Sequence, residues 1–92
     1  MSETKTKSKS KVDSILSKPY VLILHNDDVS TFDHVINCLV KVCEHELEQA
    51  TQCAYMVHNN GRCDIKYGGY DIINDMKNKL KSSGLSVTIE VN

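Results

Sequence analysis

A run of five apolar residues at 20–24, Tyr-Val-Leu-Ile-Leu, constrains the fold of this chain more than any other feature. The only proline, Pro19, precedes the run, and the polar residues His-Asn-Asp-Asp at 25–28 follow it. Pro19 favours an extended entry, and a short run without a polar residue is typical of a strand that is buried on both faces. We therefore expect a strand at 20–24 that ends at the polar stretch.

Three apolar stripes with helical spacing follow this strand. Apolar residues that recur at intervals of three and four indicate one buried face of a helix. Ser30, with Asp33 in the first turn, is expected to cap the first helix, Gly61 to end the second and residues 82–84 to end the third. The stripes are Phe32, Val35, Ile36, Leu39, Val40 and Cys43, then Leu47, Ala50, Ala54, Val57 and His58, then Ile72, Ile73, Met76 and Leu80.

Two further segments alternate as half-buried strands do. In 62–67, Cys63, Ile65 and Tyr67 alternate with polar residues, and 85–91 alternates as well. The order β-α-α-β-α-β, with short connections, predicts an α/β (α+β) sandwich of three helices packed on a three-stranded antiparallel sheet.

The 92 residues are enough for one small domain. We expect this core domain at 19–92 and a flexible tail at 1–18, whose alternating lysine, serine and threonine cannot offset the entropy of ordering. Such a tail is either a solubilising leader or a functional segment, and its composition does not decide between them.

Charge is distributed unevenly along the chain. Residues 1–19 hold five lysines against two acids, whereas the remainder holds ten acids against six Lys and Arg. An acidic folded part argues against nucleic acid as a partner, because phosphates need a cationic face. No apolar run of about 18 residues could span a membrane, and the start lacks the apolar stretch of a secretory signal. We expect a cytoplasmic protein with reduced cysteines and, by default, a monomer.

The four cysteines do not follow a metal-ligand pattern. They include no CxxC pair, and the first two lie on or beside the first helical stripe. None lies at a helix start that would activate it, and no oxyanion loop or phosphate-binding glycine turn is evident. We expect no metal, cofactor or catalytic residue, which leaves an enzyme or metal protein as the least favoured class.

The polar residues after the first strand are candidate ligands for an ammonium group. The Asn26 carbonyl beside the Asp27 carboxylate offers fixed acceptors at a strand end, although a solvated turn uses the same residues. A free α-amino group carries three hydrogens and suits about three acceptors. His58 continues the apolar face of the second helix, where a neutral imidazole could supply the third acceptor and a structural histidine is the alternative.

These residues also carry a resemblance to a known family. Residues 21–28, VLILHNDD, resemble the ClpS signature VIL-x-NDD, and ATQ at 50–52 with MVH at 56–58 and Gly61 resembles its second block, ATQ…VH-x-x-G. The resemblance runs from about Tyr20 to Asn92 and is dense up to Gly61. It implies a non-enzymatic adaptor that captures N-degron substrates and delivers them to a Clp AAA+ unfoldase for proteolysis.

The resemblance also implies roles for individual residues. Asn26, Asp27 and His58 would hold the α-amino group of the substrate, with Asp28 and Ser30 as auxiliary residues. The apolar pocket for an N-terminal Leu, Phe, Tyr or Trp would be lined by Phe32, Val35, Ala54 and Val57.

The chain departs from the family pattern at several of these positions. Phe32 replaces the gatekeeper Met, Val29 an aromatic residue, and Met76 a Lys that helps contact the unfoldase. Asp71 matches an acid at that contact, which would engage the N-terminal domain of a ClpA- or ClpC-like unfoldase. The other interpretation left open is a small α/β interaction module, similar to a ribosomal-stalk domain, that does not recognise N-terminal amines.

Overall fold

Strand β1 (Tyr20–His25) lies at the centre of a three-stranded antiparallel sheet in the order β2-β1-β3, in a computed structural model that describes residues 19–92. The other elements are α2 (Phe32–Cys43), α3 (Leu47–Asn60), β2 (Arg62–Gly68), α4 (Tyr70–Ser82) and β3 (Ser86–Val91). The predicted fold class and element order are confirmed. The tail predicted at 1–18 lies outside the described residues.

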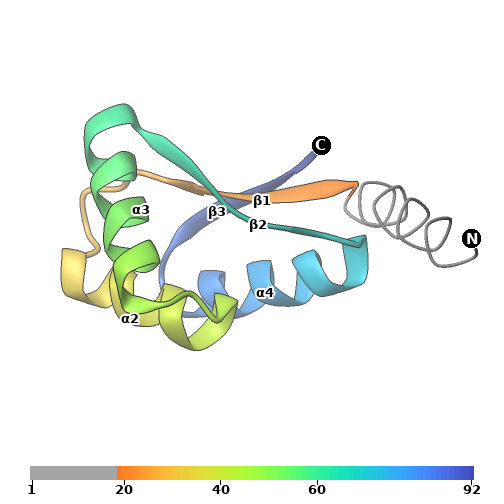
Figure 1. Ribbon diagram of the computed structural model, residues 1–92, viewed down its shortest axis with the longest axis horizontal. Coiled ribbons are helices and arrows are strands. Elements are labelled where there is room, and N and C mark those ends of the chain that lie inside the picture. Colours follow the sequence, from red (N-terminus) through yellow and green to blue (C-terminus); the bar gives the residue numbers. More distant parts are fainter. Residues whose placement is uncertain (1–18) are drawn as a thin grey trace, which may run out of the picture.

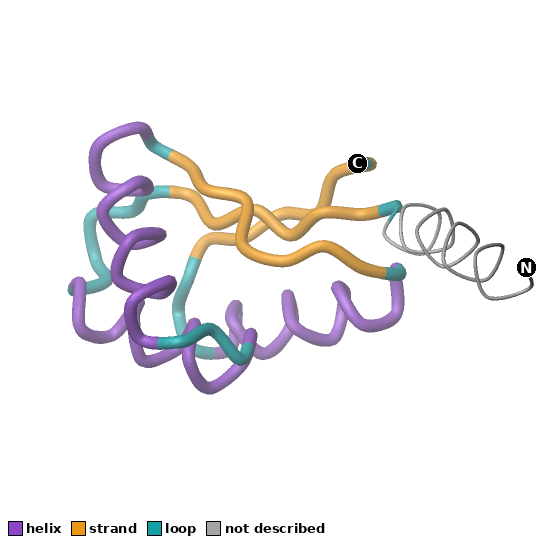
Figure 2. The backbone as a smooth tube through the Cα atoms, in the orientation of Figure 1, coloured by secondary structure: helices purple, strands orange, loops and turns teal. Residues whose placement is uncertain are grey.

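The three helices pack on one face of the sheet, as Figures 1 and 2 show. Leu22 and Leu24 of β1 point into this layer and are almost fully buried. They share one apolar core with residues of every other element, because helices and strands each turn one apolar side inward. The residues that fill its centre are Leu39, Cys43, Ala50, Ile73 and Leu80.

The opposite face of β1 is also buried, as the apolar run predicts. Val21 and Ile23 are 5% and 0% exposed, and they pair with Tyr67, Asp64, Thr88 and Glu90 of the flanking strands. Side chains of all three strands cover these two residues on the outer face, and one salt bridge and two hydrogen bonds connect them. The contacts are Arg62 Nη2 to Glu90 Oε1 at 3.3 Å, Tyr67 Oη to Asp64 Oδ2 at 2.8 Å, and His25 Nε2 to Thr88 Oγ1 at 2.7 Å.

Strand β2 does not keep the simple alternation that its sequence predicts. The pairing with β1 shifts between Leu22 and Ile23, so that Ile65 has no partner in the register. A bulge of this kind reverses the side-chain alternation beyond it. Tyr67, predicted to face the core, therefore lies on the outer face with Asp64 and is 42% exposed.

The bulge in β2 is stabilised by hydrogen bonds to residues at the connection between α2 and α3. His45, a buried residue of the α2–α3 connection, donates a hydrogen bond from Nε2 to the Ile65 carbonyl oxygen at 2.7 Å. Lys66 Nζ donates to the carbonyl oxygen of Cys43 at 3.3 Å. These two bonds fasten the connection between α2 and α3 to β2.

Two details of the helices correct the sequence prediction. The N-cap of α2 is Thr31 and not Ser30, because Thr31 Oγ1 accepts the His34 N–H at 3.1 Å. The predicted stripes also include residues at their margins that prove exposed, since only about 100° of a helix can face the core. These marginal residues are Val40, Leu47 and Ile72.

All four cysteines are buried and free of disulfides. Over residues 19–92, no group of three metal-ligating side chains comes together. No helix in the same range is long and apolar enough to cross a membrane.

Candidate functional site

The turn after β1 is fixed to the far end of α3. The Asn26 backbone N–H donates to the Gly61 carbonyl oxygen at 3.0 Å. Gly61 caps α3 in the left-handed region at φ 92°, a conformation that suits glycine because it has no Cβ. This bond brings the polar residues that follow β1 beside His58 in the last turn of α3.

Asp27 organises the turn through its own carboxylate. Oδ1 accepts the backbone N–H groups of Val29 at 2.9 Å and Ser30 at 2.8 Å, and Oδ2 accepts the Ser30 hydroxyl at 3.4 Å. These bonds, the Ser30 N–H foremost, hold the pKa of the Asp27 carboxyl below its ordinary value. Asp27 is therefore ionised at neutral pH, and Oδ2 has capacity for a further donor.

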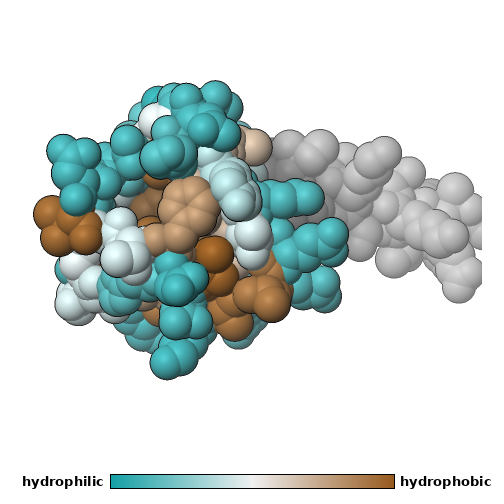
Figure 3. All heavy atoms as spheres, turned by 90° about the vertical axis from the view of Figure 1, so that its left-hand side faces the viewer, coloured by the Kyte–Doolittle hydropathy of each residue, from teal (hydrophilic) through white to brown (hydrophobic). Residues whose placement is uncertain are grey.

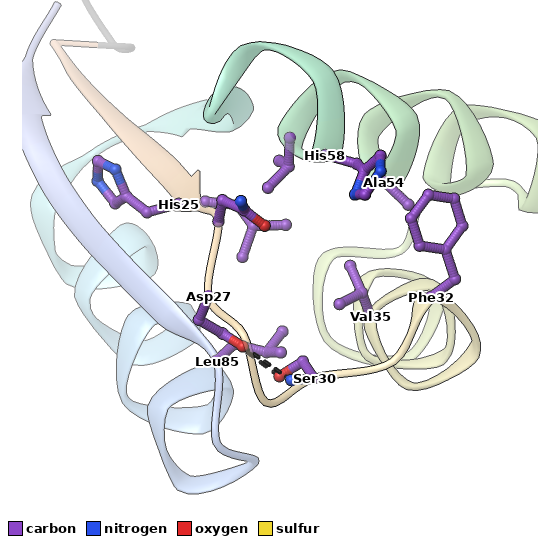
Figure 4. Close-up of a pocket in the computed structure, with 11 residues that line it drawn as sticks. His25, Asp27, Ser30, Phe32, Val35, Ala54, His58 and Leu85 are labelled. Atoms are coloured by element: carbon purple, nitrogen blue, oxygen red, sulfur yellow. Dashed lines mark hydrogen bonds between the residues drawn. The ribbon is translucent and has the colours of Figure 1, made fainter.

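A pocket of about 70 Å³ lies between this turn and the helices α2 and α3 (Figure 4). In Figure 4, Asp27 and Ser30 stand on one side, Val35 lies at the α2 side, and Ala54 and His58 come from α3. The pocket therefore combines a polar rim with an apolar wall. Its complete lining is Leu24, His25, Asn26, Asp27, Ser30, Phe32, Val35, Ala54, Val57, His58 and Leu85.

Phe32 lies at one side of the pocket in a cluster of three rings. Its ring meets Tyr55 edge-on at 4.9 Å and His58 edge-on at 5.5 Å, both at 80°. Such edge-to-face contacts each add about 0.5–1.5 kcal/mol beyond area burial, so they hold the half-buried Phe32 ring in place. Figure 3 views this end of the molecule and shows apolar side chains in its middle, surrounded by hydrophilic ones.

The pocket wall is completed by a residue from the other end of the chain. His34 Nε2 donates to the Ser83 carbonyl oxygen at 2.7 Å and so joins α2 to the turn between α4 and β3. That turn places Leu85, which is 4% exposed, in the pocket lining.

The structure gathers most of the predicted site residues in this one place. Asn26, Asp27 and His58 line its polar part, and Ser30 and the four predicted wall residues complete it. Asp28 is exposed and is not in the lining. Sequence reasoning missed Leu24, His25 and Leu85; the first two directly precede the polar motif and could have been included on that ground.

Asp71 lies elsewhere. It is in the first turn of α4, and Tyr70 beside it packs edge-on against Tyr20 at 5.3 Å, at the start of β1. The pocket follows the opposite end of that strand, so Asp71 and the pocket lie toward opposite ends of β1. Figure 1 shows the start of α4 near the start of β1, and the start of α2 and the end of α3 beside the other end of the strand.

Comparison with known proteins gives one consistent result. The family model described as "ATP-dependent Clp protease adaptor protein ClpS" matches residues 16–88. An adapter of that name from Campylobacter jejuni is 39% identical over 61 residues, which cover 66% of this chain and 62% of the relative's length. One from Nitratidesulfovibrio vulgaris is 41% identical over 46 residues, covering 50% of this chain and 44% of that relative.

A solved structure has the same fold. Agrobacterium tumefaciens ClpS2 bound to L-phenylalaninamide superposes with a TM-score of 0.71 at 22% identity, covering 83% of this chain and 99% of the other. At this identity the likeness concerns the fold alone.

Proposed function

The chain belongs to the ClpS family of ATP-dependent Clp protease adaptors, which are adaptor proteins and not enzymes. We propose that it binds N-degron substrates by their free α-amine and by a bulky hydrophobic N-terminal side chain. Binding would precede delivery of the substrate to a Clp AAA+ unfoldase. The observation that carries this proposal is the meeting of Asn26, Asp27 and His58 at the rim of one pocket with an apolar wall.

The polar rim suits an ammonium group. The Asp27 carboxylate supplies charge, and the Asn26 amide oxygen and an imidazole nitrogen of His58 supply neutral acceptors, which match the three hydrogens of an α-amine. Because the turn is held by its own hydrogen bonds, the Asp27 carboxylate needs little reorganisation when the ligand arrives.

The apolar wall suits the side chain next to that amine. Val35, Val57 and Leu85 offer no hydrogen-bonding side-chain atoms, and Ala54 leaves space where a longer residue would fill it. A cavity of about 150 Å³ holds a benzene molecule. The volume of about 70 Å³ here is smaller, so an aromatic side chain would fill the pocket and extend into its open mouth beside Phe32. L-phenylalaninamide, the molecule named with the Agrobacterium protein, has a free α-amine and a benzyl side chain.

The proposal extends to the partner. Asp71 and the start of α4 would contact the N-terminal domain of a ClpA- or ClpC-like unfoldase, at the end of the sheet remote from the pocket. Substrates would begin with Leu, Phe, Tyr or Trp, and the adaptor would act as a cytoplasmic monomer whose Lys/Ser-rich segment helps delivery.

A fluorescent peptide beginning with Phe and its N-acetylated form test the amine proposal directly. Acetylation removes the charge and two N–H donors but keeps the side chain. We expect the free peptide to bind and the acetylated one to lose at least about 100-fold in affinity, as the loss of charge-assisted hydrogen bonds requires. Equal affinities, or no binding of either peptide, would reject the proposal and favour an interaction module of another kind.

A further inference from the structure

The ring of Phe32 lies at the pocket mouth without support from the apolar core. Phe32 is the first residue of α2 and is half-buried. Among the described residues, 19–92, it is not one of the half-buried apolar side chains that pack on the core. The residues on both sides of it, Thr31 and Asp33, are exposed. The position of the Phe32 ring therefore depends on the few side chains that contact it.

Two rings of α3 contact Phe32, and they differ in their relation to the pocket. Tyr55 and His58 are three residues apart, so they project from the same side of the helix. The distance between ring centroids is 4.9 Å from Phe32 to Tyr55 and 5.5 Å from Phe32 to His58. His58 lines the pocket, whereas Tyr55 does not. Tyr55 is thus the closer ring partner, and the ligand needs no bond to it.

Tyr55 contacts Phe32 through its ring and not through its hydroxyl. The Tyr55 side chain is 55% exposed, and within residues 19–92 its hydroxyl forms no hydrogen bond to another residue. The two rings meet edge-on at 80°. Because an edge-to-face contact needs a second aromatic ring, phenylalanine at position 55 would preserve it and alanine would remove it.

We propose that Tyr55 is a positioning residue for substrate selection, which fixes the Phe32 ring at the pocket mouth and so sets the preference for N-terminal residues without a β-branch. This inference rests on the proposed function, because selection requires that the pocket binds the first residue of a substrate.

The fixed ring selects by shape. Without Tyr55, the Phe32 side chain is free to take other staggered rotamers and to turn toward solvent, since its neighbours along the chain are exposed. With Tyr55 in place, the ring stays beside His58 at the mouth. A branch at the β-carbon of the ligand lies next to the amine and has little rotational freedom, so a fixed ring excludes it.

The affinities of the full chain for Phe- and Ile-starting peptides, measured by fluorescence anisotropy, test the selection role. Tyr55→Ala should reduce the ratio of the two affinities by about 2- to 10-fold, the equivalent of one edge-to-face contact, mainly because the Ile-starting peptide binds more tightly. Tyr55→Phe should keep the parental ratio. Met56→Ala is the matched control, because Met56 is 45% exposed and faces the groove between α3 and β2.

A double-mutant cycle with Phe32→Ala tests whether Tyr55 acts through Phe32. Residues in contact are coupled, so Tyr55→Ala should leave the ratio unchanged once the Phe32 ring is absent. Tyr55→Ala should also fold, because its side chain is exposed and alanine favours a helix. An unchanged ratio in Tyr55→Ala alone overturns the proposal, and so does an equal change with and without the Phe32 ring.

NMR of the ligand-free chain tests the positioning without any peptide. Phe32 is the only phenylalanine, so phenylalanine labelled with ¹³C in the ring gives one set of ring signals. We expect Tyr55→Ala, but not Met56→Ala, to shift these signals toward their values in the urea-unfolded chain. Signals that do not shift overturn the positioning of Phe32 and leave the proposed function intact. Failure of the parent chain to bind either peptide rejects the proposed function and with it the selection role.

Discussion

The two ends of the sheet are built for different kinds of contact. Where β1 ends, the bond from the Asn26 N–H to the Gly61 carbonyl oxygen joins two separate segments around a concave pocket whose rim carries hydrogen-bond acceptors. Where β1 begins, Tyr70 packs on Tyr20, and Tyr70 and Ile72 remain 50% and 58% exposed. Small ligands are held in concave sites with a few placed polar groups, whereas exposed aromatic residues suit a flatter protein contact. Under the proposed function, substrate capture and unfoldase docking would take place at separate ends of one small domain.

This separation gives the account its main test. Substitutions at the pocket end should change peptide affinity and leave unfoldase docking intact, and substitutions at the α4 end should do the reverse.

The largest effect is expected from the charge at the pocket rim. Asp27→Asn keeps an oxygen that can accept the N–H groups of Val29 and Ser30 but removes the negative charge, and His58→Ala removes an acceptor. Loss of a charge-assisted hydrogen bond costs about 1.5–3 kcal/mol, so each variant should weaken binding of a Phe-starting peptide by very roughly 10- to 150-fold. Asp33→Asn, an exposed acid in the first turn of α2, is the matched control. Parental affinity in both pocket variants, measured by fluorescence anisotropy, would refute the assignment.

The pH dependence of binding should be the next largest effect. The ligand α-amine ordinarily loses its proton near pH 7.7–8.0, so affinity should fall about 10-fold between pH 7 and pH 9. Protonation of Asp27 should not reduce the affinity between pH 7 and pH 5, because the pKa of its carboxyl is lowered in the folded protein. For the same reason, the stability that its ionised form contributes is present above the unfolded pKa of about 3.9. It is lost only as the pH falls through the lower folded value. Flat affinity from pH 7 to pH 9 would contradict recognition of a protonated amine.

A smaller, selective effect is expected at the pocket mouth. β-branched residues carry a second branch at the carbon nearest the amine, where χ1 has little freedom, so the fixed Phe32 ring should reject N-terminal Ile and Val. Phe32→Ala should reduce the ratio of the affinities for Phe- and Ile-starting peptides several-fold, mainly because the Ile-starting peptide binds more tightly.

The melting temperature of Phe32→Ala supplies the control. Removing a fully buried Phe costs about 3–5 kcal/mol, and the half-buried Phe32 should cost less. A large loss of stability with an unchanged Ile-to-Phe ratio would mean that Phe32 is a core residue without a gatekeeper role.

The smallest effect is expected at the far end. Asp71→Asn removes an exposed charge, and exposed ion pairs contribute about 0.2–1 kcal/mol, so docking to an unfoldase N-terminal domain should weaken by no more than about 5-fold. Peptide affinity should not change. Asp75→Asn, which breaks only the exposed pair with Lys79 at 3.1 Å, is the control on the same helix. A loss of peptide affinity in Asp71→Asn would break the separation of the two ends.

Much of this arrangement could be predicted from the sequence, because the signals for it are local. The apolar run places β1 at the sheet centre, and helical spacing locates α2, α3 and α4. The motif residues Asn26 and Asp27 stand next to that strand, so their position at its end follows directly.

The features that were missed depend on contacts between distant segments. The bulge that turns Tyr67 outward is set by pairing with β1, and Leu85 reaches the pocket through the bond from His34 to Ser83. Ser30 and Thr31 are both suitable N-caps, and the choice falls on Thr31 because Asp27 engages the Ser30 N–H and hydroxyl.

The central claim is that one pocket holds the α-amine and the side chain of a substrate's first residue. An experimental structure of this chain with L-phenylalaninamide tests it most directly. The account predicts the amine nitrogen within about 2.7–3.2 Å of Asn26 Oδ1, the Asp27 carboxylate and a His58 ring nitrogen, with the benzyl group against Val35 and Val57. An amine that points to solvent, or a ligand bound elsewhere on the domain, would contradict it.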